Sequence, residues 1–186
     1  MQSIEGDLLF LTCDSNYIII QQCNCLTVTS HGLSQSITDK YPEANIYSLR
    51  RRIDNRNIAI PSDRGVPGTY VVTKINKTST MTVQKNNMYV GALMGQWRPG
   101  KIGSRYHNIY PESDPPETSK QREIWFEQSL VDLEKYLKDF GILAVAFPYM
   151  IGCGLAGGNW ENYKRMIEQF AQRNKDISVH IVKKST

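Results

Sequence analysis

The feature that most constrains this chain is the glycine-rich stretch from Phe147 to Trp160. An apolar run of strand type, 141–146, precedes it. After it, apolar side chains recur at helical spacing: Trp160, Tyr163, Met166, Ile167 and Phe170. The stretch therefore predicts a strand, a glycine-rich loop and a helix. Four glycines between positions 152 and 158 let the backbone turn with positive φ and approach another group closely.

This loop has two interpretations. Backbone N–H groups at a helix N-terminus form an anion site, because the unpaired donors and the helix dipole both point at the anion. The functional interpretation is therefore a phosphate-binding loop. The alternative is a tight turn that requires glycine for its geometry alone.

Length and composition are those of one globular domain. The chain has 186 residues, enough for a core of ordinary size, and 40% of them are hydrophobic. No internal repeat or linker divides it, so we expect one domain spanning 1–186. The net charge of +4 and the pI of about 8.8 suit an anionic ligand, but they are too weak to indicate nucleic acid.

Neither a membrane span nor a secretory signal is expected. No run of about 18 apolar residues occurs, and the N-terminus lacks a basic start followed by an apolar core. The four cysteines are Cys13, Cys23, Cys25 and Cys153. Cys23 and Cys25 lack the spacing of a zinc or redox pair, so we expect buried thiols in a reducing compartment. The expected location is the cytoplasm, with the nucleus as an alternative.

The first half of the chain begins with one strong strand. The run 17–20 is rich in β-branched residues and predicts a strand buried on both faces. A cluster of small polar residues, 23–30, follows it. Apolar residues four positions apart then predict a short helix over 33–41, which Pro42 ends.

The middle of the chain shows weaker patterns. They predict helical turns over 44–51, a short strand at 57–61, an alternating strand at 69–75, a turn at 76–80, and an apolar strand at 88–94. The segment 98–118 is rich in Gly, Pro, Ser, Tyr and Asp and reads as a long loop, which in a compact domain is usually functional or mobile.

The second half alternates helix and strand. The expected order is an amphipathic helix of about twenty residues around 126–137, a strand at 141–147, a helix at 159–173 and a strand at 176–182. This alternation predicts a largely parallel sheet with helices on both faces. Ligands of such sheets bind outside the carboxyl ends of the strands, where the loops 23–32, 95–118 and 149–158 would converge.

Three polar residues could carry chemistry at such a site. Asp7 follows Gly6 at the predicted start of a strand; its carboxylate could accept a hydrogen bond from an exocyclic amine such as that of adenine, or simply face water. Asn24 could hold a ribose hydroxyl or cap the following helix. His31 could act as a general acid or base near neutral pH, or be structural or exposed.

The residues around the glycine loop also have alternatives. Tyr149 could stack on a base or ribose, or fill an edge of the core. Asn159 suits a helix N-cap and Glu161 suits a first helical turn. The sequence has no H-E-x-x-H, paired-cysteine or EF-hand pattern, so we infer no metal and no cofactor.

Together these segments resemble those of macrodomains, the α/β modules that bind ADP-ribose. Residues 6–8, Gly-Asp-Leu, resemble the early Gly-Asp-Ile/Leu of that family. Residues 23–25 and 32–37 resemble its ribose-side loop and helix. Residues 148–154 resemble its diphosphate loop, and 160–161 resemble the next helix start in the branch that carries Gly-Cys-Gly-Leu.

The resemblance implies a three-layer α/β fold with a mixed, largely parallel sheet and helices on both faces. It implies that Asp7 contacts adenine and that Asn24 and His31 are catalytic. The ligand-binding set that it implies is Asp7, Leu8, Cys23, Asn24, Gly32, Tyr149, Ile151, Gly152, Cys153, Gly154, Leu155 and Ala156. The implied partners are ADP-ribose, its 1″-phosphate and mono-ADP-ribosylated proteins.

Within that family the chain is similar to the branch of ADP-ribose 1″-phosphate phosphatases and terminal ADP-ribose protein glycohydrolases. It departs from the glycohydrolase at Ala156, where that enzyme has an acidic residue, and the catalytic lysine of that enzyme has no evident counterpart. Residues 30–32 are Ser-His-Gly, where macrodomains commonly have more glycine. An ionisable group beside the distal ribose favours hydrolysis over binding alone.

Three functions follow as hypotheses. The leading one is hydrolysis of ADP-ribose 1″-phosphate to ADP-ribose and phosphate. The second is removal of mono-ADP-ribose from proteins in the same pocket, and the third is a non-catalytic reader of ADP-ribosylated partners. The sequence leaves the substrates open, because both present the same ADP-ribose and differ only at the C1″ substituent.

Overall fold

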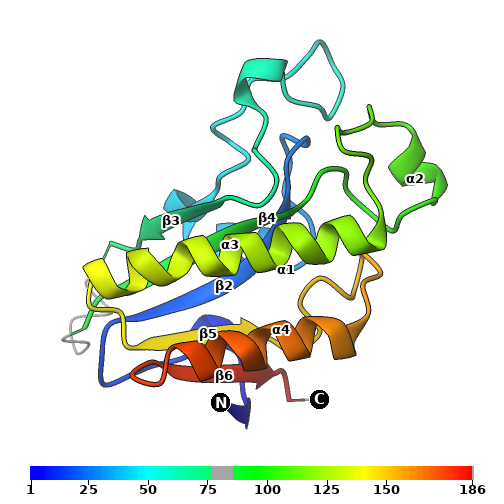
Figure 1. Cartoon of the computed structure of the whole chain (residues 1–186). Helices are drawn as coiled ribbons and strands as arrows, with labels where there is room; N and C mark the ends of the chain where they lie inside the picture. Colours follow the sequence, from blue (N-terminus) through cyan, green and yellow to red (C-terminus); the bar gives the residue numbers. More distant parts are fainter. Residues whose placement is uncertain (77–85, 186) are drawn as a thin grey trace.

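The computed structural model describes residues 1–76 and 86–185. Its centre is a six-stranded sheet with helices on both faces, as Figure 1 shows. The strands are β1 (Gln2–Glu5), β2 (Tyr17–Asn24), β3 (Tyr70–Lys74), β4 (Met88–Gln96), β5 (Ala144–Pro148) and β6 (Ser178–Lys183). Their order in the sheet is β1-β6-β5-β2-β4-β3.

Every neighbouring pair of strands is parallel except β3 and β4, which are antiparallel. The prediction of a mixed, largely parallel sheet is therefore confirmed. Because β2 pairs with β4 on one side and β5 on the other, the carboxyl ends of all three strands lie at one edge of the sheet.

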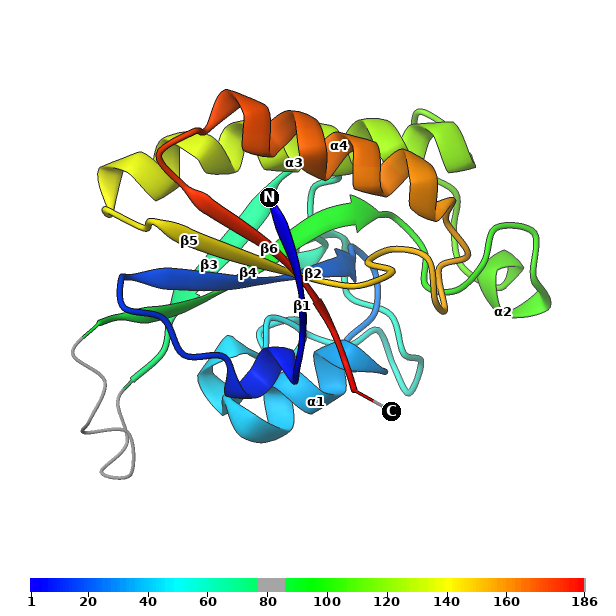
Figure 2. The same cartoon turned by 90° about the horizontal axis from the view of Figure 1, so that it is seen from below.

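Helices form the two outer layers. They are α1 (Leu33–Lys40), α2 (Arg105–Asn108), α3 (Ser119–Asp139) and α4 (Trp160–Arg173), with 3₁₀ turns η1 (Leu8–Phe10), η2 (Pro42–Ala44) and η3 (Pro61–Asp63). Figure 2 shows α3 and α4 on one face and α1 on the other. The helices expected near 33–41, 126–137 and 159–173 are thus confirmed, and Asn159 caps α4 by accepting from the N–H of Glu161 at 3.0 Å.

The two apolar layers explain the continuous hydrophobic runs. Along β2, Ile18 and Ile20 pack with the apolar side chains of α3 and α4. Tyr17 and Ile19 pack on the opposite face with Ile37 of α1. Successive side chains of a strand point to opposite faces, so a strand covered on both sides is apolar at every position.

Two predictions near the chain start and middle are wrong in detail. Asp7 does not begin a strand; β1 ends at Glu5, and Asp7 caps η1. The segment 44–51 forms turns after η2 rather than a helix, because the Asn45 side chain accepts from the N–H groups of Tyr47 and Ser48 and competes with helical bonding.

The remaining expectations for the middle segments hold in part. The segment 57–61 contributes a single bridge, between Ala59 and Arg52, instead of a strand. The turn expected at 76–80 lies outside the described residues after position 76. Among the described residues, no helix is long and apolar enough to cross a membrane.

Candidate functional site

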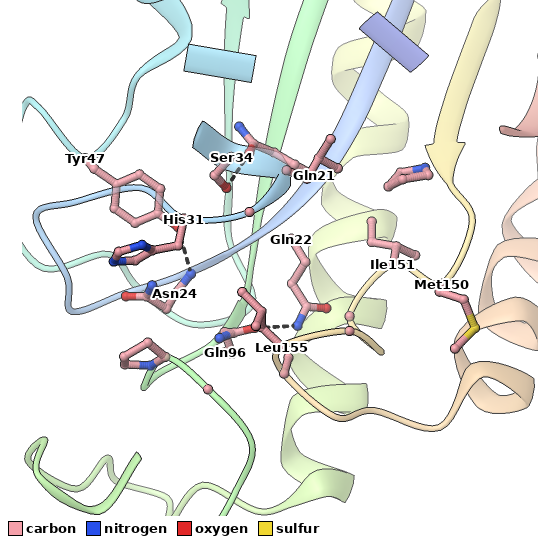
Figure 3. A pocket seen from close by; sticks show the side chains of 18 of the residues that line it. Gln21, Gln22, Asn24, His31, Ser34, Tyr47, Gln96, Met150, Ile151 and Leu155 are labelled. Carbon is pink, nitrogen blue, oxygen red and sulfur yellow. Dashed lines mark hydrogen bonds between the residues drawn. The ribbon is translucent and has the colours of Figure 1, made fainter. Parts of the chain in front are cut away.

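A cavity of about 850 Å³ lies at the carboxyl ends of β2, β4 and β5. The loops that follow these strands all contribute to its walls, so the three segments expected to converge do so. Figure 3 shows side chains from these loops around one hollow. Nine residues expected at the site line it: Asn24, His31, Gly32, Tyr149, Ile151, Gly152, Gly154, Leu155 and Ala156.

The glycine loop is held in shape by its own backbone hydrogen bonds. The N–H of Gly158 donates to the carbonyl of Gly152 at 3.0 Å, and the N–H of Cys153 donates to that of Met150 at 2.9 Å. Other N–H groups in the loop have no acceptor among residues 1–76 and 86–185. They belong to Met150, Gly152, Gly154, Leu155 and Ala156, all of which line the cavity.

The glycines of this loop differ in what they do. Gly152 has φ +71°, and a Cβ atom there would lie 2.5 Å from Tyr163 Cε1. A Cβ atom on Gly158 would lie 2.6 Å from the carbonyl oxygen of Gly152. Gly154 is different: its backbone is outside the left-handed region, and a Cβ atom would meet nothing within 4 Å. The fold therefore needs glycine at 152 and 158 but not at 154.

Asn24 is turned toward its own loop. Its side-chain oxygen accepts from the N–H groups of Leu26 and Thr27 at 3.0 and 2.8 Å, and its amide nitrogen donates to Thr27 Oγ1 at 2.8 Å. The residue is only 8% exposed, yet it lines the cavity. The expectation that Asn24 caps the following helix is therefore wrong: the N-cap of α1 is Gly32, and Asn24 closes the 24–27 turn instead. The amide nitrogen carries two protons, and one of them goes to Thr27.

His31 lies on the cavity wall and is exposed to solvent. Its Nε2 lies 3.4 Å from Thr29 Oγ1, which also lines the cavity. No carboxylate forms an ion pair with it among the described residues. The imidazole is therefore accessible to a bound ligand, and a hydroxyl is the group that orients it.

Asp7 and Leu8 lie outside the cavity wall. The Asp7 carboxylate accepts from the N–H of Leu9 at 2.9 Å, and Lys184 Nζ lies 4.0 Å from it. Leu8 is 6% exposed and packs in the core under α1. Asp7 nevertheless lies at the same end of the parallel strands as Tyr149, because Asp7 follows β1 and Tyr149 follows β5. The strands β1 and β5 lie on either side of β6 and are therefore two strand spacings, or about 10 Å, apart.

The two cysteines expected at the site are buried beside it. Cys23 Sγ lies 3.7 Å from Ser34 Oγ, and burial raises the pKa of its thiol. Burial also raises the pKa of Cys153 to about 11, and its thiol donates to the carbonyl of Ile151 at 3.2 Å. Both thiols are therefore protonated at neutral pH, which excludes them as ready nucleophiles.

The cavity rim is partly apolar. Tyr149 is 44% exposed and makes an edge contact with Trp160, with ring centroids 5.1 Å apart. A Cβ atom placed on Gly32 would lie 3.4 Å from Leu155 Cδ1, so the Leu155 side chain reaches across to the loop before α1. An aromatic ring at one end and an apolar side chain over the middle suit a ligand with a flat, apolar part.

The cavity floor contains polar residues that the sequence analysis missed. Ser34 Oγ donates to Gln21 Oε1 at 2.7 Å, and Gln22 Nε2 donates to Gln96 Oε1 at 2.9 Å, as Figure 3 shows. All four side chains line the cavity. Three of them, Gln21, Gln22 and Gln96, come from the ends of β2 and β4. The sequence signal that could have identified them is the change from apolar to amide residues at the end of each strand.

A buried charged cluster behind the cavity was also missed. It consists of Arg98 just after β4, His107 in α2, Glu117 before α3, and Arg122 in the first turn of α3. The Glu117 side chain, 1% exposed, accepts from Arg122 Nε at 2.8 Å and lies 3.0 Å from His107 Nε2. The long loop 97–118 is therefore anchored by buried ion pairs.

Among the described residues, no group of three or more His, Cys, Asp or Glu side chains is arranged to hold a metal ion. The chemistry that the cavity itself offers is hydrogen bonding to an anion by backbone N–H groups, amide and hydroxyl contacts on its floor, and an accessible imidazole.

The architecture defines the class of fold. Solved macrodomain structures superpose on nearly the whole chain, and this chain has the three-layer macrodomain fold. The macrodomain of Mycobacterium tuberculosis DarG has a TM-score of 0.66 at 17% identity, covering 100% of this chain and 99% of that one. The macrodomain of Thermus aquaticus DarG has a TM-score of 0.62 at 14% identity, covering 98% and 97%.

A third similar structure is that of Thermosipho africanus DarTG in complex with ADP-ribose. It has a TM-score of 0.55 at 16% identity and covers 96% of this chain and 40% of that one. No family model matches the sequence, and a comparison with curated proteins finds no match either. At these identities the likeness establishes the fold.

Proposed function

We propose that this protein binds ADP-ribose in the cavity and hydrolyses an ADP-ribose derivative. The observation that carries the proposal is the set of loop N–H groups at the cavity wall that have no acceptor among the described residues, those of Met150, Gly152, Gly154, Leu155 and Ala156. A diphosphate supplies the anionic oxygens that such donors bind. The volume of about 850 Å³ suits a ligand of this size, and the similar T. africanus protein is in complex with ADP-ribose.

The proposed orientation places the diphosphate at the glycine loop. The adenine then lies toward Tyr149 and the edge that carries Asp7, and the distal ribose lies toward Asn24 and His31. Among the described residues that line the cavity, His31 is the only ionisable side chain besides tyrosine, and this orientation puts it next to the C1″ substituent. His31 would position or deprotonate a water molecule, or protonate the leaving oxygen.

We propose ADP-ribose 1″-phosphate as the leading substrate. Water adds to phosphorus, the bond from phosphorus to the C1″ oxygen breaks, and a proton ends on that oxygen, giving ADP-ribose and phosphate. Removal of mono-ADP-ribose from proteins would use the same pocket, with the bond broken at C1″ instead. Both reactions use the imidazole in the same place.

A non-catalytic reader is the second candidate function. The environment of His31 favours it, because the imidazole is oriented by the Thr29 hydroxyl instead of by a carboxylate. In a Ser-His-Asp triad the partner of the histidine is a carboxylate, which also stabilises the imidazolium that forms, whereas the Thr29 hydroxyl is neutral. A non-catalytic reader would need the same N–H donors of the glycine loop but no catalytic side chain beside C1″.

The test combines binding and turnover on one preparation. Calorimetry is expected to show micromolar affinity for ADP-ribose, since several convergent N–H groups bind the diphosphate. Parallel incubations with ADP-ribose 1″-phosphate and with mono-ADP-ribosylated protein then measure released phosphate and released ADP-ribose. Absence of binding at millimolar ADP-ribose would refute the whole proposal. Binding without turnover of either substrate would refute hydrolysis and support the non-catalytic reader.

A further inference from the structure

One guanidinium joins the two loops that form opposite walls of the cavity. Arg122 is 2% exposed, and its Nη1 donates to the carbonyl of Gly100 at 2.9 Å and to that of Ala156 at 3.0 Å. Its Nη2 donates to the carbonyl of Arg98 at 3.2 Å. Gly100 and Ala156 both line the cavity, whereas Arg122 lies behind them, so the Arg122 side chain forms hydrogen bonds to both loops from outside the cavity.

Glu117 fixes the guanidinium from behind. Its carboxylate accepts from Arg122 Nε at 2.8 Å and from the backbone N–H of Trp97 at 2.8 Å. The carboxylate also accepts from the N–H of Arg98 and contacts His107. Arg122 therefore has a single available orientation, in which its remaining donors face the two loops.

The two buried guanidinium groups of the cluster are held differently. That of Arg122 pairs with the buried carboxylate of Glu117, whereas that of Arg98 donates to the carbonyl of Pro111 at 2.9 Å. Glu112, an acidic partner of Arg98, is 81% exposed and lies 3.4 Å away, so solvent screens its charge. Among the described residues, the buried ion pair of this cluster that reaches the glycine loop is therefore that of Arg122 with Glu117.

We propose that Arg122 is a positioning residue that sets the separation of the glycine loop from the 97–101 segment and so aims the loop N–H groups at the anion. The identity of that anion as a diphosphate rests on the proposed function. Arginine suits the task because its planar fork presents several donors in fixed directions. Lysine retains the charge beside Glu117 but cannot reach three carbonyls with the same geometry.

The test uses Arg122→Lys, with Arg173→Met as the matched control. Arg173 also pairs with a carboxylate of α3, that of Glu134 at 2.8 Å, but it contacts neither loop. Two measurements are made on each variant. Amide hydrogen exchange of the ligand-free protein reports the loops themselves, and calorimetry reports ADP-ribose affinity.

For Arg122→Lys we expect at least tenfold faster exchange of the hydrogen-bonded amides in the two segments, those of Cys153, Gly157, Gly158 and Arg98. We expect unchanged exchange in β2 and α4 and at least tenfold weaker ADP-ribose binding. Arg173→Met should match the wild type in both measurements. Wild-type exchange in both loops of Arg122→Lys would overturn the proposal. Loss of protection throughout β2 and α4 would also overturn it, because Arg122 would then serve the folding of the whole domain.

The two proposals fail separately. If the wild type does not bind ADP-ribose, the proposed function fails, and exchange in the ligand-free loops alone decides whether Arg122 positions them. If Arg122→Lys does not fold, Glu117→Gln replaces it, because the amide has one acceptor oxygen in place of two and can no longer hold both Arg122 and His107 in their present positions. Glu117→Gln is held to the same exchange and affinity outcomes.

Discussion

Gly154 offers the sharpest test of the anion site, because it is the loop glycine that the fold does not require. A side chain there enters open space from a backbone conformation that any residue adopts. Gly154→Ala should therefore fold with wild-type stability. Gly154→Glu should also fold, but it places a carboxylate at the cavity wall where the diphosphate would lie.

The magnitude follows from Coulomb repulsion. Two unit charges about 5 Å apart at an effective dielectric constant of about 20 repel by about 3 kcal/mol. Since about 1.4 kcal/mol corresponds to a factor of ten, ADP-ribose affinity should fall by roughly 150-fold before any steric effect is counted. The loss should shrink as salt is added, because an open site is partly screened.

The assay is calorimetry at low and high salt, with thermal unfolding to verify the fold. Leu143→Glu is the control: it introduces the same side chain at a half-exposed position just before β5, at the opposite edge of the sheet. Its ADP-ribose affinity should stay at the wild-type level. Wild-type affinity in a folded Gly154→Glu variant would mean that the loop is only a turn.

Three further predictions concern single residues. His31→Ala should lower turnover by about 100-fold or more with ADP-ribose affinity nearly intact, measured on one preparation; wild-type turnover would remove His31 from the chemistry. Asp7→Ala should weaken ADP-ribose by about 1.5–3 kcal/mol more than ribose 5-phosphate, whereas equal losses would leave only its capping role. Gly158→Ala should lower the free energy of unfolding by about 1–3 kcal/mol in urea titrations, since its Cβ would overlap the Gly152 carbonyl, while Gly154→Ala should not.

Local sequence patterns were sufficient wherever an element carries its own signal. The apolar run at 17–20, the four-residue spacing in 33–41 and the Asn159 cap each predicted an element that the structure contains. Periodicity and capping depend on neighbours in the chain, so they can be read without the fold. The same holds for the glycine loop, whose residue types and position between strand and helix are local.

β1 lacked such a signal. Its four residues, Gln2–Glu5, are mostly exposed, and they form a strand because they pair with β6, where Gln2 lies opposite His180. Gln2 and His180 are far apart in the sequence, so their pairing depends on the final position of β6 beside β5, which leaves the other side of β6 open to β1. This is why Asp7 was expected at the start of a strand and lies after the end of one.

For the site, the sequence by itself determined which chemical groups are available: loop N–H donors, the amide of Asn24 and the imidazole of His31. Only the tertiary structure decided their use, because parallel pairing of β2 with β4 and β5 brings the three loops together. It also turned the Asn24 amide toward Thr27 and placed Arg122 against the carbonyl of Ala156, 34 positions along the chain. Contacts between residues so far apart have no local pattern, since packing alone selects them.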